Sequence, residues 1–261
     1  MRGDVVEPRS DRSDEEEIDI NLRSPSEVGR RLVVLATLCR RAFLEPATSS
    51  EELDEDPEAE RFDLATWLDE HNLAAELTDQ ERALLGAPVG TLSGDEAHAA
   101  TWNAEALVAL GWAVGLVSVI PDPIDPADPN PVLQAIPGPW DDPRGLIDSI
   151  TLCPEERSAS ERERAEIWLW RAETEEERRR LRGRALLELE GDLRDVVRQS
   201  VEAGLINAGV EGDFPVAGRP FRTLDENRID VAAGVAAVRL HALNWLCGFG
   251  TTWDDVPLDV D

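Results

Sequence analysis

The sequence contains no lysine and no tyrosine, and its single methionine is Met1. All 26 basic residues are therefore arginines, set against 55 acidic residues, which gives a formal net charge of −29. Without lysine, catalysis through a lysine Schiff base is excluded. So acidic a chain repels phosphate groups, which argues against nucleic acid and membrane surfaces as partners and leaves a basic protein partner open. Arginine in place of lysine is typical of a GC-rich genome, and the acid surplus also fits adaptation to salt.

Cysteine is scarce and apolar runs are short. Cys39, Cys153 and Cys247 are an odd number at wide spacing, so they predict neither a disulfide framework nor a metal site. The N-terminus has no apolar run typical of a signal peptide, and the longest apolar stretch, 106–120, is shorter than the roughly 20 residues of a membrane helix. We therefore expect a cytoplasmic protein that does not enter membranes.

The common catalytic signatures are missing as well. No phosphate-binding loop with lysine, no G-x-S-x-G and no H-E-x-x-H occurs, and the glycine-rich stretch 86–94 lacks the phosphate-loop spacing. No cofactor is predicted. Whether the chain is an enzyme stays open at this point.

What the sequence does contain is helical patterning. Residues 229–247 are apolar or small on every side of a helix, and 106–116 are similar, so both are expected to be buried helices packed together. The pattern predicts an all-α fold of about six to seven helices around these two, in one domain over residues 23–261. Residues 1–22 are predicted to be a disordered acidic tail. The proline-rich excursion 121–145 is predicted to be non-helical, with any minor β ribbon lying in 121–152.

Capping signals predict where the helices begin. A serine or threonine followed three residues later by glutamate satisfies the free N–H groups of a first helical turn. This signal predicts a single helix over 93–116 and another over 174–206, and Asp56 before Pro57 is a further start. The five predicted capping boxes begin at Ser24, Thr78, Ser93, Thr174 and Thr223.

Polar residues inside the two buried helices are the first site candidates. A buried Arg239 needs a carboxylate partner, and Glu105 is the obvious one, with Glu166 next. With His241 they make either a catalytic cluster with a perturbed pKa or a structural ion pair that fixes helix register, and the structural interpretation is favoured.

A second set of candidates is aromatic and acidic. The carboxylates of Asp254 and Asp255 follow Trp253 but do not have the spacing of a calcium loop, so no metal is predicted. Many indoles in one chain indicate core packing or an aromatic-lined pocket. The candidate binding residues are Trp102, Trp168, Asn244, Trp245, Trp253, Asp254 and Asp255.

Four pieces of sequence resemble one known family. They are SPSEVGRRLVVLATL (24–38), TWNAEALVALGWAVGL (101–116), RAEIWLWRAE (164–173) and ALNWLCGFGTTWDDVPLD (242–259). Together they resemble the bacterial family catalogued as domain of unknown function number 4272, over about residues 22–261. The resemblance implies a soluble, mostly helical cytosolic domain, and it carries over no catalytic residue.

Two functional hypotheses follow. The favoured one is a non-catalytic protein-interaction or regulatory module, because catalytic motifs are missing and the acidic surface suits a basic partner. The alternative is an enzyme of unknown class, with Glu105, Arg239, His241 and the Asp254–Asp255 pair around a tryptophan-lined pocket. Oligomeric state is not predicted.

Overall fold

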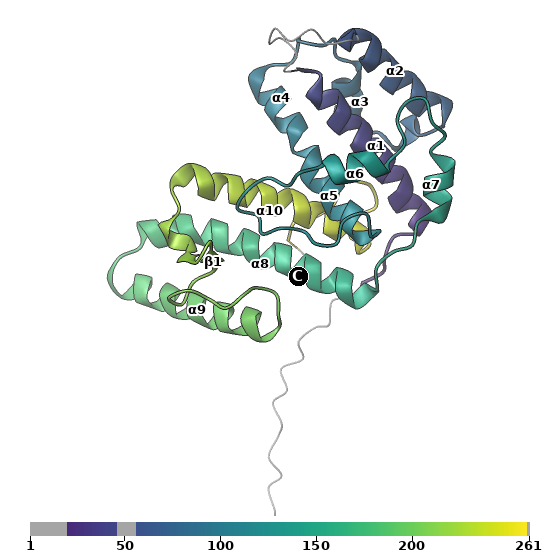
Figure 1. Ribbon diagram of the computed structural model, residues 1–261. Helices are drawn as coiled ribbons and strands as arrows, with labels where there is room; N and C mark the ends of the chain where they lie inside the picture. Colours follow the sequence, from purple (N-terminus) through teal and green to yellow (C-terminus); the bar gives the residue numbers. More distant parts are fainter. Residues whose placement is uncertain (1–19, 46–55, 260–261) are drawn as a thin grey trace, which may run out of the picture.

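Helices form most of the computed structural model, which describes residues 20–45 and 56–259 (Figure 1). The all-α class is thereby confirmed. In chain order the elements are α1 (Pro25–Phe43), α2 (Pro57–Glu70), the 3₁₀ turn η2 (Ala74–Glu76), α3 (Asp79–Gly86), α4 (Gly94–Thr101), α5 (Asn103–Ala113), α6 (Asn130–Ala135), α7 (Arg144–Ser149), α8 (Glu155–Arg180), α9 (Gly183–Glu202), β1 (Pro215–Val216), β2 (Arg219–Pro220), the 3₁₀ turn η3 (Phe221–Thr223) and α10 (Glu226–Leu246).

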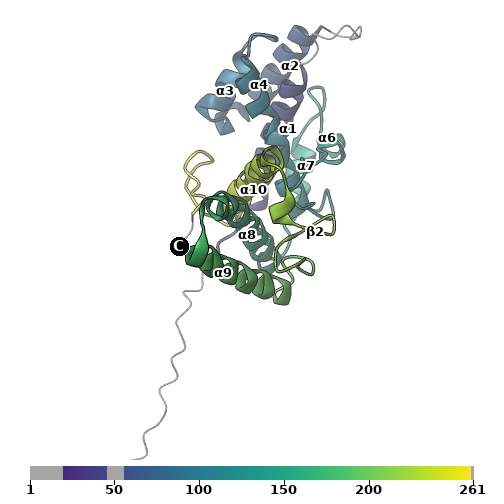
Figure 2. The ribbon, with the colours of Figure 1, turned by 90° about the vertical axis from the view of Figure 1, so that its left-hand side faces the viewer.

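The core follows a chain of helix contacts. α1 packs on α5, α5 packs on α10, and α10 packs on α8, so one hydrophobic cluster runs through the molecule. Figures 1 and 2 show α10, α8 and α9 stacked at one end and α2, α3 and α4 gathered around α1 at the other. The predicted pairing of α5 with α10 is confirmed, and Trp245 is only 7% exposed. α1 is as deeply buried as these two helices.

Burial of α10 is incomplete at its beginning. Val231, Ala233 and Val238 are half-buried, whereas nearly every residue from Arg239 to Cys247 is buried. Figure 1 shows the first turns of α10 lying beyond α5, with α8 on one side. The apolar pattern of the sequence therefore describes the second half of α10 better than the first.

Three predicted capping boxes are confirmed and two are wrong. Ser24, Thr78 and Ser93 each make both hydrogen bonds of the box. Thr174 lies buried within α8, which runs on to Arg180 before the chain turns at Gly183 (φ +64°), a conformation that suits glycine. α10 is capped by Asp225, whose side chain accepts from the N–H of Arg228.

The single helix predicted over 93–116 is two helices, α4 and α5, joined at Trp102. The N–H of Trp102 donates to the carbonyl of Ala99, three residues back, which tightens the turn. The Trp102 indole then lies against Gly234 of α10, where a Cβ atom would approach the ring to 2.8 Å. Close packing on a glycine thus fixes the position of the break.

The proline-rich excursion contains a helix, contrary to the prediction. α6 lies inside it, and Pro131 occupies the first turn, where a missing N–H costs nothing. α7 begins directly after Pro143. The only ribbon in the described residues is β1–β2, not a ribbon in 121–152, and its turn places Ala217 (φ +49°) and Gly218 (φ +76°) in the left-handed conformation of a tight hairpin.

Only the last residues of the predicted tail, Ile20 to Leu22, are described; the rest of 1–22 lies outside the described residues. The N–H of Asn21 donates to the carbonyl of Cys247 (3.1 Å), and the N–H of Arg23 donates to that of Leu246 (2.9 Å). These bonds satisfy carbonyl groups that the end of α10 would leave unpaired. Residues 20–23 therefore belong to the folded part of the chain.

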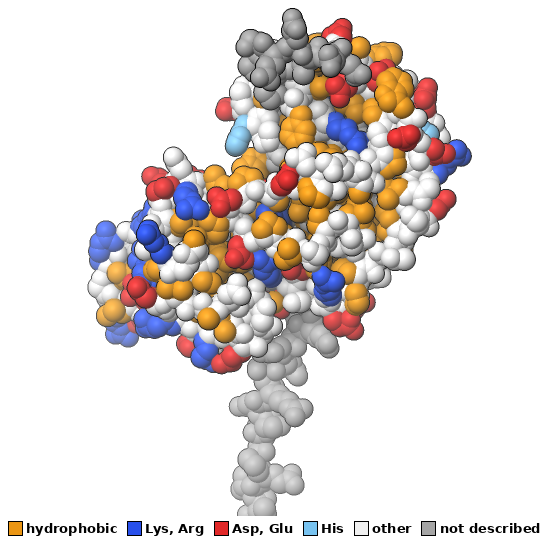
Figure 3. Space-filling view, viewed as in Figure 1, with side chains coloured by type: hydrophobic (Ala, Val, Ile, Leu, Met, Phe, Trp, Pro, Cys, Tyr) orange, Lys and Arg blue, Asp and Glu red, His pale blue; other side chains and the backbone are white. Residues whose placement is uncertain are grey.

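The surface of the described residues is uneven in charge. Arginines gather at the junction of α8 and α9, in the segment 178–184, and Figure 3 shows them at one end of the molecule. Among the described helices, none has the length and apolar character needed to cross a membrane.

Candidate functional site

The predicted pair of Glu105 and Arg239 exists and joins α5 to α10. Nε and Nη2 of Arg239 both lie 2.8 Å from Oε2 of Glu105, and both residues are at least 97% buried. The other Glu105 oxygen accepts from the N–H of Ala127 (2.8 Å), and Arg239 also donates to the carbonyl of Pro121. Burial lowers the pKa of Arg239, while the nearby Glu105 carboxylate opposes that shift. The pair therefore holds two helices and the proline-rich segment together.

Almost no free space adjoins this pair. A cavity of about 10 Å³ is bordered by Arg239, Glu161 and Trp168, which is room for about one water molecule. Burial raises the pKa of Glu161 despite the neighbouring Arg164. The buried indole N–H of Trp168 has no acceptor among the described residues. A substrate cannot enter, so the arrangement fits a structural role.

His241 lies on another side of α10, because residues two apart on a helix differ by about 200°. Its ring meets Trp253 edge to face at 4.7 Å between centroids, and Trp245 meets the same indole at 5.4 Å. The guanidinium carbon of Arg31 stacks over Trp253 at 3.9 Å. Burial lowers the pKa of His241, and its hydrogen bond with the Trp253 backbone acts in the other direction. The structure thus places His241 with Trp253, apart from Glu105 and Arg239.

Beside this aromatic cluster runs an open groove of about 700 Å³ between α3, α4 and the segment that follows α10. We call it the α3–α4 groove; Figure 2 shows the C-terminal segment, in yellow, approaching α3. Its apolar walls are Ala83, Leu84, Ala87, Leu92, Ala99 and Ala100. Its polar lining is Thr78, Gln80, Glu81, Glu96, Asn103 and Asp254, with Trp253 among them.

The sequence builds this groove from small residues and two capped helix starts. Alanines on both helices leave space between them, and the capping boxes bring Glu81 and Glu96 to its edge. Glu81 is 8% exposed and forms a two-pronged ion pair with Arg31, one distance being 3.0 Å. Its Oε2 also accepts from the N–H of Thr78 (3.0 Å).

Most polar groups of the groove therefore have structural partners already. Glu96 accepts from the backbone N–H of Ser93 (2.8 Å), and Asn103 donates to the carbonyl of Ala100 (2.9 Å). Asp254 is exposed at the edge. Asp255 instead caps its own loop, where hydrogen bonds from Thr251 and the Thr252 backbone lower its pKa.

Three other predicted binding residues lie in packed positions outside the groove lining. Trp168 is buried edge to face with Phe214, and Trp102 is wedged against α10. Asn244 is fully buried; it accepts from Nε of Arg162 (2.7 Å) and donates to the carbonyl of Pro257 (2.8 Å). Only Trp253 and Asp254 of the predicted set line the groove. Arg31 and Glu81 were not predicted as site residues, although an arginine beside a long apolar stripe is itself a signal.

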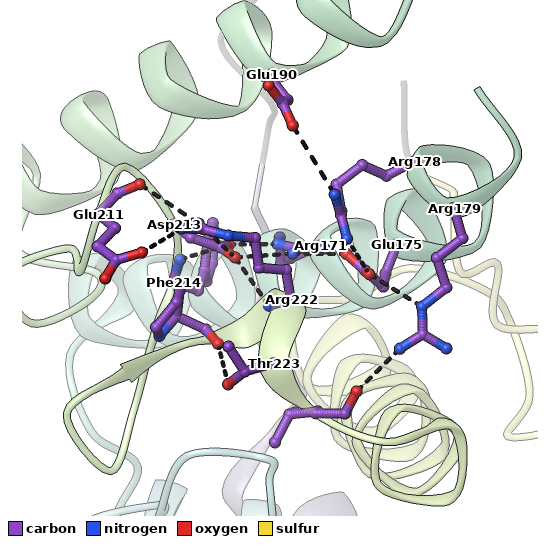
Figure 4. A network of polar contacts seen from close by, with 12 residues as sticks. Arg171, Glu175, Arg178, Arg179, Glu190, Glu211, Asp213, Phe214, Arg222 and Thr223 are labelled. Atoms are coloured by element: carbon purple, nitrogen blue, oxygen red, sulfur yellow. Dashed lines mark hydrogen bonds and ion pairs between the residues drawn. The ribbon is translucent and has the colours of Figure 1, made fainter. Parts of the chain in front are cut away.

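The most extensive buried ionic network lies elsewhere, between α8 and the loop before β1 (Figure 4). Arg171, Glu175 and Asp213 have fully buried side chains. Nε of Arg171 donates to Asp213 (2.7 Å), Nη2 donates to Glu175 (2.9 Å), and Arg178 donates twice to Glu175. Burial acts to raise the pKa of Glu175, but hydrogen bonds from Arg178 and Arg171 outweigh it and hold that pKa low. Each carboxylate is committed to arginines, so the network secures the loop.

In the described part of the chain, no group of three potential metal ligands among His, Cys, Asp and Glu converges. All three cysteines are free, and burial raises the pKa of Cys39 and Cys247 to about 12. These two cysteines are core residues.

One protein-family model, "Domain of unknown function (DUF4272)", matches residues 12–183, which is more than half of the 261-residue chain. The chain belongs to this family. The matched part of DUF4272 ends at the start of α9, so α10 and the residues 242–259, which also carry the resemblance, lie beyond it. No curated protein and no solved structure matches the chain.

Proposed function

We propose that this DUF4272 protein is a non-catalytic protein-interaction or regulatory module whose partner binds in the α3–α4 groove. The observation that carries the proposal is the make-up of the groove. Its walls are apolar side chains, four of them alanines, its edge bears carboxylates, and its buried polar groups already have structural partners. A volume of about 700 Å³ lies in the range of ligand sites.

A basic protein partner fits this surface best. Glu96 and Asp254 are exposed at the groove edge, and the whole chain carries a net charge of −29, which speeds association with cations. The same charge disfavours nucleic acid as a partner.

Free cysteines fit a reducing compartment, which supports a cytoplasmic location.

An enzyme of unknown class remains the alternative. It is favoured by the meeting of Glu81, Asp254 and Trp253 in one groove. A general base, however, needs a proton-accepting group within hydrogen-bond reach of substrate, and Glu81 is held by Arg31 and the backbone of Thr78. An interaction module accounts for the groove and does not require the ion pair between Glu81 and Arg31 to break.

Site-specific photo-crosslinking in cells tests the proposal. A crosslinking amino acid replaces Leu84 in the groove, and in a matched control it replaces Leu187, which is 67% exposed on α9. We expect one discrete protein adduct at position 84 that is missing at position 187. Identical adduct patterns at both positions, or none at position 84, would overturn the proposal.

A further inference from the structure

The lining of the α3–α4 groove also indicates the chemistry of the segment that it would bind. We infer that the α3–α4 groove binds an amphipathic helix that presents large apolar side chains on one face and arginine or lysine beside them. This inference rests on the proposed function and narrows it to one class of ligand.

The walls indicate the apolar face of the ligand. Ala83 and Ala99 line the groove from facing helices, and both are exposed although neither has a polar group. Between short side chains there is room for long ones, so leucine, isoleucine or phenylalanine would fill the space that alanine leaves. A volume of about 700 Å³ suits several such side chains, as from successive turns of one helix face, and not a whole helix.

The elements around the groove favour a helix over an extended peptide. Extended peptides commonly bind by adding a strand to a sheet edge. The only sheet in the described residues is the ribbon β1–β2, whose two strands have two residues each and belong to the loop before α10. The groove lies between two helices, where the side-chain ridge of a third helix can pack.

The edge indicates the charge of the ligand. Glu96 stands at the first turn of α4, and Asp254 stands on the segment that follows α10, near Arg31 and the first turn of α3. Glu81 adds no free charge, because Arg31 neutralises it. Among the described residues, the groove thus offers two separate exposed carboxylates, and no basic side chain of that part of the chain lines it. Cationic residues on both flanks of an apolar stripe match this arrangement.

Three synthetic helical peptides provide the probes. The first carries leucines at helical spacing with flanking arginines, the second has glutamate in place of arginine, and the third has serine in place of leucine. Binding to the full chain is measured by fluorescence anisotropy at physiological ionic strength. We expect the first peptide to bind at least about 10-fold more tightly than either of the others, which corresponds to about 1.4 kcal/mol.

Protein variants separate the groove from the general negative charge of the chain. Ala99→Trp fills the groove without changing charge, and Ala83→Trp is a second filler at another exposed position. Glu96→Gln with Asp254→Asn removes the edge charges while glutamine preserves the capping box. The matched control is Glu163→Gln with Glu173→Gln, two exposed carboxylates on α8.

We expect the filled variants to weaken binding of the first peptide by more than about 10-fold, and the edge variant to weaken it by about 3- to 10-fold, as expected for one or two exposed ion pairs. The control variant should bind like the wild type. Equal loss in the control, or full binding by both filled variants, would overturn the inference. A protein adduct at position 84 in cells, together with no binding of the three peptides, would support the interaction module and contradict a helical ligand. No adduct and no peptide binding would contradict both proposals.

Discussion

The guanidinium of Arg239 has exchanged water for one carboxylate and one carbonyl oxygen deep between α5 and α10. Such a pair contributes little net stability, but losing one partner is costly because the other charge stays buried. We therefore expect Arg239→Met to lower the free energy of unfolding by about 3–5 kcal/mol.

Adding Glu105→Gln should recover much of that loss, since glutamine is neutral and can still accept from the N–H of Ala127. Urea unfolding followed by circular dichroism measures both variants. A double variant less stable than Arg239→Met would contradict the expectation.

The imidazole of His241 provides a pH prediction. Burial beneath Trp253 lowers its pKa in the folded state below the usual value of about 6.5. Because the unfolded chain binds the proton more readily, this residue lowers stability at acid pH, and stability rises as pH increases from the folded pKa to about 6.5.

Titration of the His241 ring by NMR should give a midpoint below about 6.5. Trp253→Ala should raise that midpoint by letting water reach the ring. A midpoint that is unchanged by Trp253→Ala would show that another group controls the shift.

The pairing of a single side chain was predictable from the sequence where only one residue could meet its requirement for a partner. A lone arginine in an apolar helix requires a carboxylate, and Glu105 was the single acid within the other apolar helix. Arg31 had several acids within possible reach, and nothing local pointed to Glu81 or to the face of Trp253. Such pairings depend on how distant segments meet.

The loop between α9 and α10 depends on one buried carboxylate. Asp213 accepts from Arg171 and from the backbone N–H groups of Phe214 and Arg222. Asp213→Ala should destabilise the protein by about 3–5 kcal/mol, because Arg171 would stay buried with Glu175 as its remaining partner.

The matched control is Asp195→Ala, which removes an exposed carboxylate of α9 paired with Arg198. It should shift stability by less than about 1 kcal/mol. Thermal unfolding of the two variants side by side makes the comparison, and equal midpoints would show that the loop is not secured through Asp213.

The helices begin at the capping signals of the sequence only where tertiary packing does not favour another boundary. The boxes at Ser24, Thr78 and Ser93 stand where helices begin, whereas Thr174 carries the same signal but is buried inside α8. Burial against the core keeps α8 continuous there, because tertiary packing outweighs the roughly 1 kcal/mol that a cap contributes.

The molecule as a whole carries 29 more negative than positive charges. Repulsion between them opposes the compact state, and salt screens it over about 10 Å at 0.1 M. Raising NaCl from about 0.05 M to about 0.5 M should therefore raise the unfolding midpoint, with most of the increase at the lower concentrations. A midpoint that falls with salt would mean that ion pairs such as those of α8 outweigh the repulsion.

The sequence by itself determined the helical class, the burial of α5 and of the second half of α10, four helix starts and the Glu105–Arg239 pair. These features depend on residues within a few positions of each other or on a requirement that one residue could meet. The tertiary structure decided where α8 ends, how Asp213 secures its loop, and that α3, α4 and the Trp253 segment enclose a groove. A groove is the space between segments far apart in the chain, and its shape is set by their packing against a shared core.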